Sequence, residues 1–192
     1  MSGWHAELPV AARVRELEER LIAAGLVTDA ELDDILTSVY ASASPANGAR
    51  MVARAWTDPA YRERLLADGN AAAAELGFTG LHYLLKAVEN TAGVHNVIVC
   101  TLCSCYPTSL LGPSPSWYKS FAYRARVVRE PRAVLAEFGL RLPEQTEIRV
   151  WDANSQTRYV VLPVAPEQRA GLDEDALAAM VSRNGLIGTA LR

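Results

Sequence analysis

Sulfur is scarce in this 192-residue chain, which has three cysteines, all between residues 100 and 105. A secreted domain held by disulfides needs an even number of cysteines that close long loops, and this odd cluster cannot supply them. An extracellular disulfide framework is therefore not expected. We expect the sulfur in this one segment to serve chemistry.

Long apolar runs are also missing. No stretch reaches the roughly 18 to 20 apolar residues that a membrane-spanning helix needs. The first thirty residues carry Glu7, Glu16, Glu18 and Glu19, where a signal peptide would be apolar. We expect a cytoplasmic protein that does not enter a membrane.

Neither sign of charge dominates. The formal net charge is -3, from 19 basic and 22 acidic residues, and the basic residues are spread along the chain. Nucleic acids and anionic membranes are bound by concentrated basic surfaces, so neither partner is expected. The length and composition suit one compact domain with an appendage, or two small domains.

The first forty residues predict two short amphipathic helices. Pro9 suits a first helical turn, and apolar residues recur at helical spacing from Val14 until Gly25. Thr28 and Glu31 form a capping box at the start of the second helix.

Residues 41–48, ASASPANG, are small or break helices, and they mark the best internal boundary. We therefore expect an N-terminal helical arm, residues 1–46, and a main domain, residues 47–192. Because the two arm helices have little core of their own, we expect the arm to pack on a partner chain.

The main domain mixes helices with strands. Further helices are expected within 59–69, 70–77, 131–139 and 172–183, the last of them closing the chain. Strands are expected at 94–99, 147–152 and 157–163, and the last two are expected to form a hairpin through residues 153–156. This order predicts an α+β fold, a layered α/β sandwich with a mostly antiparallel sheet.

The cysteine loop, residues 100–105, has the spacing Cys-x-x-Cys-x-Cys, which lets Cys100, Cys103 and Cys105 converge on one metal ion. Structural zinc would need a fourth ligand, and the nearest histidine, His95, is expected on the opposite strand face from Cys100. A redox pair in C-T-L-C would leave Cys105 unused. Simple buried cysteines would not be expected to cluster.

A metal that prefers five or six ligands must take the remainder from water or from the backbone of the loop. The amide nitrogens of Ser104 and Cys105 are held in place between the sulfurs. A deprotonated amide is a strong donor that suits a trivalent low-spin ion better than zinc. A sixth, open position would polarise a small ligand or activate water.

The segment ENTAGVHNVIVCTLCSCYP, residues 89–107, resembles the metal-claw region of nitrile hydratase α subunits. The similarity runs from about residue 48 to the C-terminus through WYKS, RARVVREPRAVLAEFG, IRVWDANSQTRYVVLP, RMVARAWTDPAYRERLLADG and LIGTAL. The resemblance implies the fold of that family.

The resemblance implies that Cys100, Cys103 and Cys105, with the amides of Ser104 and Cys105, hold one non-corrin metal ion. It implies oxidation of Cys103 to sulfinic acid and of Cys105 to sulfenic acid. Thr101 stands where cobalt-type members have threonine and iron-type members have serine, so we expect cobalt(III) in preference to iron. The residues expected to be catalytic are Cys103, Ser104 and Cys105. Either the Cys105 sulfenate or a metal-activated water is the nucleophile.

The resemblance also implies partners. We expect a β-type subunit that supplies two arginines to the site, a metallochaperone or activator, and no activity of this chain alone. Tyr106, Asp152 and Arg158 match family positions that support the metal site. Each has a simpler alternative, since Tyr106 could be a core aromatic, and Asp152 and Arg158 could form a cross-strand pair.

Two segments depart from the family pattern. In YPTSLLGPSP, residues 106–115, Thr108 replaces a tryptophan, and Ser109 and Ser114 replace prolines. Loss of the indole would remove a wall of the substrate pocket, and we expect Thr108 and Ser109 to admit a bulky, polar or heteroaromatic nitrile of nucleoside type. The second departure is GFTGLHYLL, residues 77–85.

Three functions remain open. The first is the metal-bearing catalytic subunit of a nitrile hydratase, a hydro-lyase that adds water to a nitrile to give an amide. The second is the equivalent metal-binding subunit of thiocyanate hydrolase, which acts on a related carbon–nitrogen triple bond. The third is a non-catalytic cobalt carrier.

Overall fold

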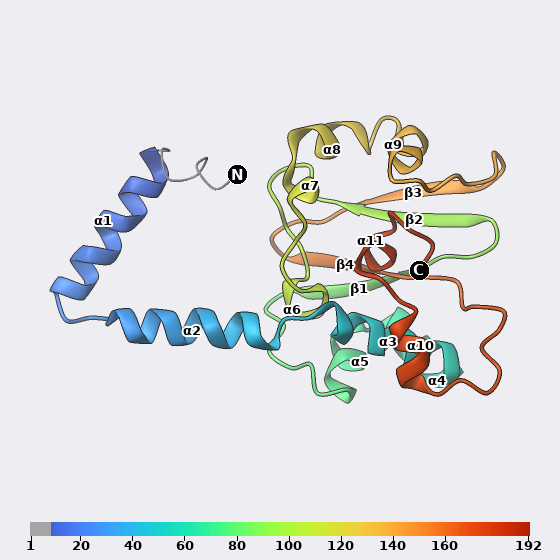
Figure 1. Ribbon diagram of the computed structural model, residues 1–192, viewed down its shortest axis with the longest axis horizontal. Coiled ribbons are helices and arrows are strands. Elements are labelled where there is room, and N and C mark those ends of the chain that lie inside the picture. The colour runs from blue at the N-terminus through green and yellow to red at the C-terminus, as the bar shows by residue number, and fades with distance from the viewer. Residues whose placement is uncertain (1–8) are drawn as a thin grey trace. The chain divides into compact units, whose positions relative to one another are not determined.

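A computed structural model describes residues 9–192 of the protein, and the chain divides into two compact units, Met1–Ala41 and Ser42–Arg192. Figure 1 labels the helices and strands. In chain order they are α1 (Pro9–Ala23), α2 (Asp29–Ser42), α3 (Pro45–Thr57), α4 (Pro59–Ala67), α5 (Gly69–Glu75), β1 (Leu84–Glu89), β2 (Val94–Val99), α6 (Thr108–Leu111), α7 (Ser116–Lys119), α8 (Phe121–Arg126), α9 (Pro131–Glu137), β3 (Glu147–Asp152), β4 (Thr157–Leu162), α10 (Glu174–Ala179) and α11 (Arg183–Ile187).

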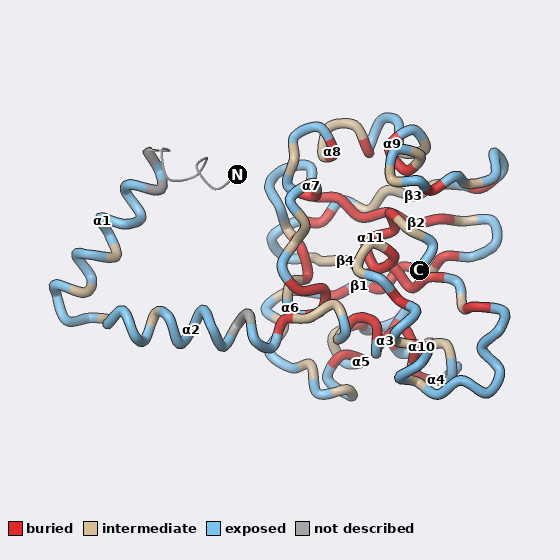
Figure 2. The backbone as a smooth tube through the Cα atoms, in the orientation of Figure 1, coloured by how far each residue is buried: buried red, intermediate tan, exposed pale blue. Residues whose placement is uncertain are grey.

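Among the described residues, the first unit contains helices α1 and α2, as the sequence predicted. Thr28 and Glu31 form the expected capping box, in which the amide of Thr28 donates to Glu31 Oε2 at 2.8 Å and the amide of Glu31 donates to Thr28 Oγ1 at 3.2 Å. The apolar side chains of both helices are largely exposed (Figure 2), with Val14 and Leu17 each 57% accessible and Ile35 60% accessible. The described helices of this unit therefore bury little of their apolar surface.

The break between the units is shorter than the small-residue segment suggested. Ser44 caps α3, and its hydroxyl accepts the amide of Ala46 at 3.2 Å. Pro45 to Gly48 already form the first turn of α3, so the expected boundary between residues 46 and 47 falls inside that turn. The proline suits this place because its missing N–H has no helical partner there.

The strands form two separate parallel pairs. β1 pairs with β4 from Leu84↔Thr157 to Glu89↔Leu162, and β2 pairs with β3 from Val94↔Glu147 to Val99↔Asp152. The expected mostly antiparallel sheet is therefore wrong, and so is the expected hairpin of β3 with β4. The expected α+β class holds.

The chain between β3 and β4 crosses from one sheet to the other. Asn154 accepts the amides of Gln156 and Thr157 at 2.9 and 3.0 Å through its side-chain oxygen, which tightens the bend. Beyond the bend, the rings of Trp151 and Tyr159 pack at 5.3 Å, so the two strands meet through side chains. Turn residues between two strands signal a reversal of direction, but they do not distinguish a hairpin from such an arch.

Helices cover both outer edges of the strands. In Figure 1, α8 and α9 lie beyond β3, whereas α3, α4, α5 and α10 gather on the side of β1. The strands between them carry much of the core (Figure 2), and β2 is buried along most of its length, as is usual for parallel strands with both faces covered. Strand β1, the short helices α6 to α8 and the terminal helix α11 were not predicted.

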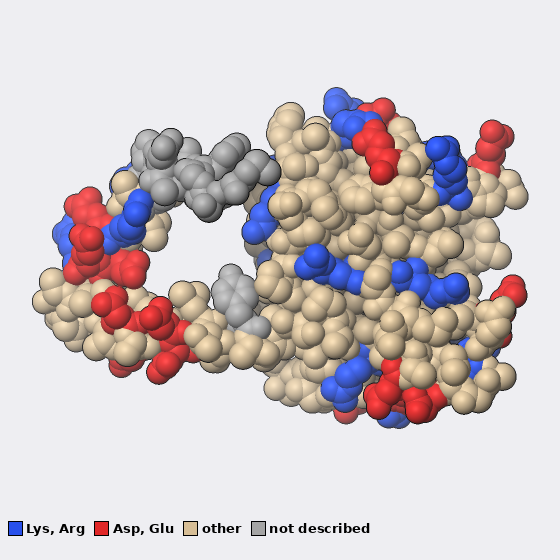
Figure 3. Space-filling view, in the orientation of Figure 1, with Lys and Arg blue, Asp and Glu red and all other residues tan. Residues whose placement is uncertain are grey.

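On the face of the larger unit shown in Figure 3, blue and red side chains are scattered among uncharged ones, and no continuous basic surface is visible there. Within the described residues, no helix has the length and apolarity required to cross a bilayer.

His95 is a buried histidine of β2, outside the cysteine loop. Its Nε2 donates to the carbonyl of Gly188 at 2.7 Å, and its Nδ1 lies 3.3 Å from Asn90 Nδ2, which assigns the neutral ring with the proton on Nε2. Burial lowers the pKa of His95, and the Gly188 carbonyl offsets part of that effect.

His95 is predicted to make the folded chain less stable in mild acid. Because its pKa is lower in the folded than in the unfolded chain, the unfolded chain binds a proton first as the pH falls. The free energy of unfolding should decline as the pH falls through about 6.5, the unfolded value, until the folded-state pKa is passed. Urea unfolding between pH 8 and pH 5 should show a shallower decline in His95→Gln than in the parent chain. Equal slopes would contradict the prediction.

Candidate metal centre

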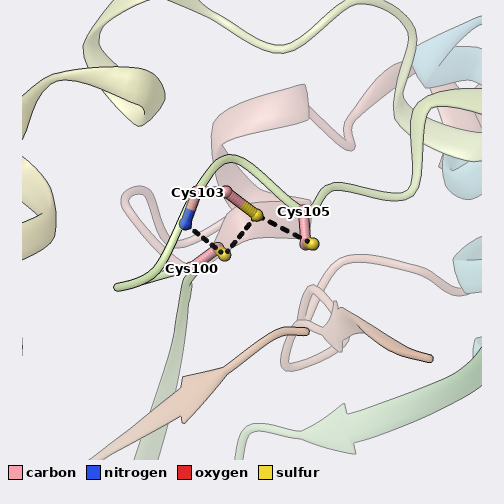
Figure 4. A group of neighbouring side chains, drawn as sticks. All are labelled: Cys100, Cys103 and Cys105. Atoms are coloured by element: carbon pink, nitrogen blue, oxygen red, sulfur yellow. Dashed lines mark hydrogen bonds between the residues drawn. The ribbon is translucent and has the colours of Figure 1, made fainter. Parts of the chain in front are cut away.

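The three cysteines converge immediately after β2. Cys100 is buried, Cys105 is half-buried and Cys103 is exposed, and their sulfurs all lie within 4.8 Å of one another. Figure 4 shows Cys103 between its neighbours, with its sulfur 3.5 Å from that of Cys100 and 3.2 Å from that of Cys105. Among the described residues, this group able to hold a metal contains no histidine or carboxylate.

The loop bends tightly enough to bring backbone amides to the same place. The amide of Cys103 donates to Cys100 Sγ at 3.3 Å. The pKa of Cys103 is lowered to about 7, chiefly by the thiols of Cys105 and Cys100 and further by the amides of Ser104 and Cys105. Burial and the neighbouring Cys103 sulfur raise the pKa of Cys105. Of Cys103 and Cys105, Cys103 is therefore the thiol that loses its proton more readily.

This donor set fits a transition-metal ion. Three thiolates so close together repel one another, and a cation between them removes that repulsion. Sulfur donors select soft or borderline metals, whereas magnesium and calcium prefer oxygen. The backbone amides of Ser104 and Cys105 also lower the pKa of the Cys103 thiol.

Asp152 holds the start of the cysteine loop. Its carboxylate accepts the amide of Thr101 at 2.9 Å and the Thr101 hydroxyl at 2.5 Å. The pairing of β2 with β3 places Asp152 opposite Val99, at the point where the chain enters the loop. Asp152 and Arg158 lie on strands of different sheets, so the cross-strand pair considered from the sequence is not formed.

Three side chains of α7 and α8 also hold the loop, and sequence reasoning did not identify them. The hydroxyl of Tyr118 donates to the carbonyl of Cys105 at 2.9 Å. The hydroxyl of Tyr123 donates to the carbonyl of Ile98, in the strand that leads into the loop, at 2.6 Å. Arg124 Nη2 donates to the carbonyls of Thr101 and Leu102 at 3.0 and 3.1 Å. Nothing in the spacing along the chain indicates these contacts, because they depend on where the short helices pack.

Tyr106 and Arg158 differ in how they relate to the cysteine cluster. Tyr106 is buried, its hydroxyl donates to the Leu111 carbonyl at 3.4 Å, and its ring meets Tyr118 edge-on at 5.0 Å. These contacts are those of a core aromatic. The positive charge of Arg158 lowers the pKa of Cys105, against the larger opposing effect of burial.

Thr108 and Ser109 begin α6, shortly after the cysteine loop. Thr108 is half-buried and Ser109 is exposed. The carbonyl of Ser109 accepts the side-chain amide of Asn47 at 2.9 Å, which ties α6 to the first turn of α3. Thr108 and Ser109, which replace a tryptophan and a proline of the family pattern, thus lie on a helix that starts three residues after Cys105.

Comparison with known proteins identifies the family. A family model described as "Nitrile hydratase, alpha chain" matches residues 8–190. The chain is 48% identical over 181 residues to the cobalt-containing nitrile hydratase subunit alpha of Pseudonocardia thermophila, covering 93% of this chain and 89% of that protein. It is 45% identical over 159 residues to the thiocyanate hydrolase subunit gamma of Thiobacillus thioparus, covering 77% of this chain and 65% of that protein.

Solved structures give the same result. An Fe-type nitrile hydratase double mutant from Comamonas testosteroni Ni1 matches with a TM-score of 0.87 and 43% identity, covering 94% of this chain and 89% of that chain. A recombinant thiocyanate hydrolase with partially modified cobalt centres matches with a TM-score of 0.86 and 40% identity, covering 96% of this chain and 90% of that chain. From the family model and these relatives together, the chain belongs to the nitrile hydratase α-chain family.

Proposed function

We propose that this chain is the metal-bearing catalytic subunit of a cobalt-type nitrile hydratase, which adds water to a nitrile to give an amide. The observation that carries the proposal is the convergence of three sulfurs within 4.8 Å at the end of β2. Thr101 favours cobalt over iron, and relatives such as the Pseudonocardia thermophila protein are cobalt-containing.

The residues of the cysteine loop would hold the ion. Cys100, Cys103 and Cys105 would supply sulfur, and the backbone amides of Ser104 and Cys105 would supply nitrogen. When bound, cobalt(III) supplies Lewis acidity for the addition of water to the nitrile. Cys103 and Cys105, as sulfinic and sulfenic acids, would present oxygen atoms beside the reacting carbon.

The surrounding side chains would keep that loop in place during the reaction. Asp152 restrains Thr101, and Tyr118 restrains the Cys105 carbonyl. Arg158 would place positive charge beside Cys105, and Tyr106 would support the loop by packing against Tyr118. A loop restrained in this way pre-organises its donors and reduces the reorganisation that metal binding requires.

The proposal includes a partner chain. Subunit names of the relatives point to assemblies, and the exposed apolar side chains of α1 and α2 suit packing against a β-type subunit. We propose that residues 1–46 serve this purpose, and that residues 47–192 form the catalytic domain. The β-type subunit would contribute two arginines, a metallochaperone or activator would load the ion, and the assembly would be cytoplasmic.

We propose that the substrate is a bulky nucleoside-type nitrile such as toyocamycin. In this proposal the chain is the α subunit of a toyocamycin nitrile hydratase. The reason is the replacement of a tryptophan by Thr108, together with Ser109, at the start of α6. A hydroxyl-bearing side chain in place of an indole leaves volume and a polar group for a larger ligand.

Kinetics on the assembled enzyme test this substrate proposal. The parent enzyme should have a higher kcat/KM for toyocamycin than for acrylonitrile. Thr108→Trp should lower kcat/KM for toyocamycin by about tenfold or more, since a lost pocket contact of 1–3 kcal/mol has that effect. The same variant should leave acrylonitrile nearly unaffected, which makes acrylonitrile the matched control. A parent enzyme that prefers acrylonitrile would contradict the proposal.

A second candidate is the metal-binding subunit of a thiocyanate hydrolase, favoured by the match to subunit gamma of Thiobacillus thioparus. A thiocyanate turnover higher than the nitrile turnover would favour this second candidate.

A non-catalytic cobalt carrier is the third candidate. Metal analysis with mass spectrometry of the 100–105 peptide distinguishes this carrier from a catalytic subunit, because stoichiometric cobalt with three added oxygens supports catalysis. Zinc with unmodified thiols would reject the cobalt enzyme.

A further inference from the structure

Arg124, on α8, contacts both peptide units that join Thr101 to Cys103. Its Nη2 donates to the carbonyl of Thr101 at 3.0 Å and to the carbonyl of Leu102 at 3.1 Å. A terminal guanidinium nitrogen carries two N–H groups, so this one nitrogen can serve both carbonyls. The two carbonyls therefore face the same side of the cysteine loop, toward α8.

Side-chain packing does not hold this part of the loop. Leu102 is 83% accessible and Cys103 is exposed, so neither side chain is packed into the core. A loop peptide unit between two exposed residues can rotate unless its N–H or its C=O is hydrogen-bonded. Asp152 bonds the amide and the hydroxyl of Thr101, at the beginning of the loop. The orientation of the peptide unit between Leu102 and Cys103 therefore depends on its own hydrogen bonds.

The hydrogen bond from Arg124 also sets the direction of the next amide. Because a peptide unit is planar and trans, its N–H points away from its C=O. The Leu102 carbonyl is turned toward Arg124. The amide of Cys103 then faces the opposite side, where it donates to Cys100 Sγ at 3.3 Å, as Figure 4 shows. Arg124 and Cys100 thus hold the two ends of one peptide unit.

The neighbours of Arg124 on α8 fix its backbone beside the loop. The hydroxyl of Ser120 caps the helix and accepts the amide of Tyr123 at 3.2 Å. Tyr123 is buried, its hydroxyl donates to the carbonyl of Ile98 at 2.6 Å, and its ring meets that of Trp117 at 4.9 Å. These contacts attach α8 to the end of β2. The next residue, Arg124, therefore starts from a fixed position from which it reaches the loop.

We propose that Arg124 is a positioning residue that turns the peptide unit between Leu102 and Cys103 so that the Cys103 amide donates to Cys100 Sγ. The proposal rests on the proposed cobalt centre, in which Cys100 is a sulfur ligand. With this peptide unit held at both ends, the cysteines keep the spacing that the ion needs, and metal binding requires less reorganisation. Arg124 acts through the backbone of the loop and takes no part in the reaction itself.

The orientation of the peptide unit can be measured without metal. In NMR spectra of the reduced full chain, the amide of the exposed Cys103 should exchange slowly with solvent, because its hydrogen is bonded to sulfur. Arg124→Met keeps a long side chain but has no donor, so this protection should fall by about tenfold or more. Arg126→Met is the matched control, since Arg126 lies on the same helix but bonds Glu130 and Glu137.

Cobalt binding gives a second readout. Anaerobic titration of the reduced chain with cobalt(II) is followed by sulfur-to-cobalt charge-transfer absorption. Arg124→Met should weaken binding by about 10- to 100-fold, the change expected when a group supporting a metal ligand is removed. Arg124→Lys should recover part of the lost affinity, because an ammonium group can donate to the same carbonyls. Arg126→Met should bind within about twofold of the parent chain, as expected for a surface change away from the loop.

A Cys103 amide that stays protected in Arg124→Met would overturn the proposal, and so would cobalt binding by that variant equal to that of the parent chain. Equal behaviour of Arg124→Lys and Arg124→Met would also overturn it, because both keep a long side chain and only lysine keeps donors. If Arg124→Met does not fold, Arg124→Gln takes its place, since glutamine is polar but too short to reach both carbonyls. Failure of the parent chain to bind cobalt would reject the proposed function, whereas the amide measurement needs no metal and still decides whether Arg124 orients the peptide unit.

Discussion

Cobalt binding should be lost when Cys103 is replaced by alanine. Cys103 lies between the other two cysteines, with its sulfur within 3.5 Å of both, so its loss removes the central donor of the cluster. Changes to groups that only support a metal ligand weaken binding by about 10- to 100-fold, and removal of a ligand should exceed the upper value. Hydration of nitriles by the assembled enzyme should fall to background.

Ser104→Ala is the matched control for this prediction. Only the backbone amide of Ser104 is proposed as a ligand, so removal of its hydroxyl should leave cobalt stoichiometry unchanged. Metal analysis of the purified variants decides both expectations. A Cys103→Ala protein that retains full cobalt would show that the ion is held elsewhere. Loss of cobalt from Ser104→Ala would show that the side chain takes part.

Gly188→Ala should destabilise the larger unit strongly. Gly188 has a φ of +90°, and a Cβ atom there would lie 2.0 Å from the carbonyl oxygen of Asn96 and 2.8 Å from the Cα of Val97. Both atoms belong to the backbone of β2, which leads directly into the cysteine loop and cannot move without disturbing its pairing with β3. Left-handed strain and the clash together should cost about 3 kcal/mol or more.

The measurement is thermal or urea unfolding, with Gly93→Ala as the control. Gly93 directly precedes β2, but its φ is not positive and a Cβ atom there would meet nothing within 4 Å. For a chain of this length, a loss of about 3 kcal/mol should lower Tm by about 6–12 °C. The control should change Tm by no more than a small fraction of that. Equal Tm values for the two variants would contradict the predicted clash.

Contacts between residues close together in the sequence were predicted correctly, whereas contacts between distant segments were not. The capping box of Thr28 and Glu31 was predicted correctly because both partners lie within one turn of the same helix. Strands β2, β3 and β4 were located correctly from their β-branched and aromatic residues. Their pairing was predicted wrongly, because residues 153–156 bend the chain into an arch whose side-chain packing, between Trp151 and Tyr159, is not visible in the turn itself.

The chemistry of the metal centre can be inferred from the cysteine spacing. Three cysteines within six positions must lie close together whatever the fold, because the covalent chain limits their separation. The surroundings of the cysteines follow from the tertiary structure, since parallel pairing placed Asp152 at Thr101, and helix packing placed Tyr118 at the Cys105 carbonyl. These partners are far apart in sequence, so their meeting depends on long-range packing that no local pattern encodes.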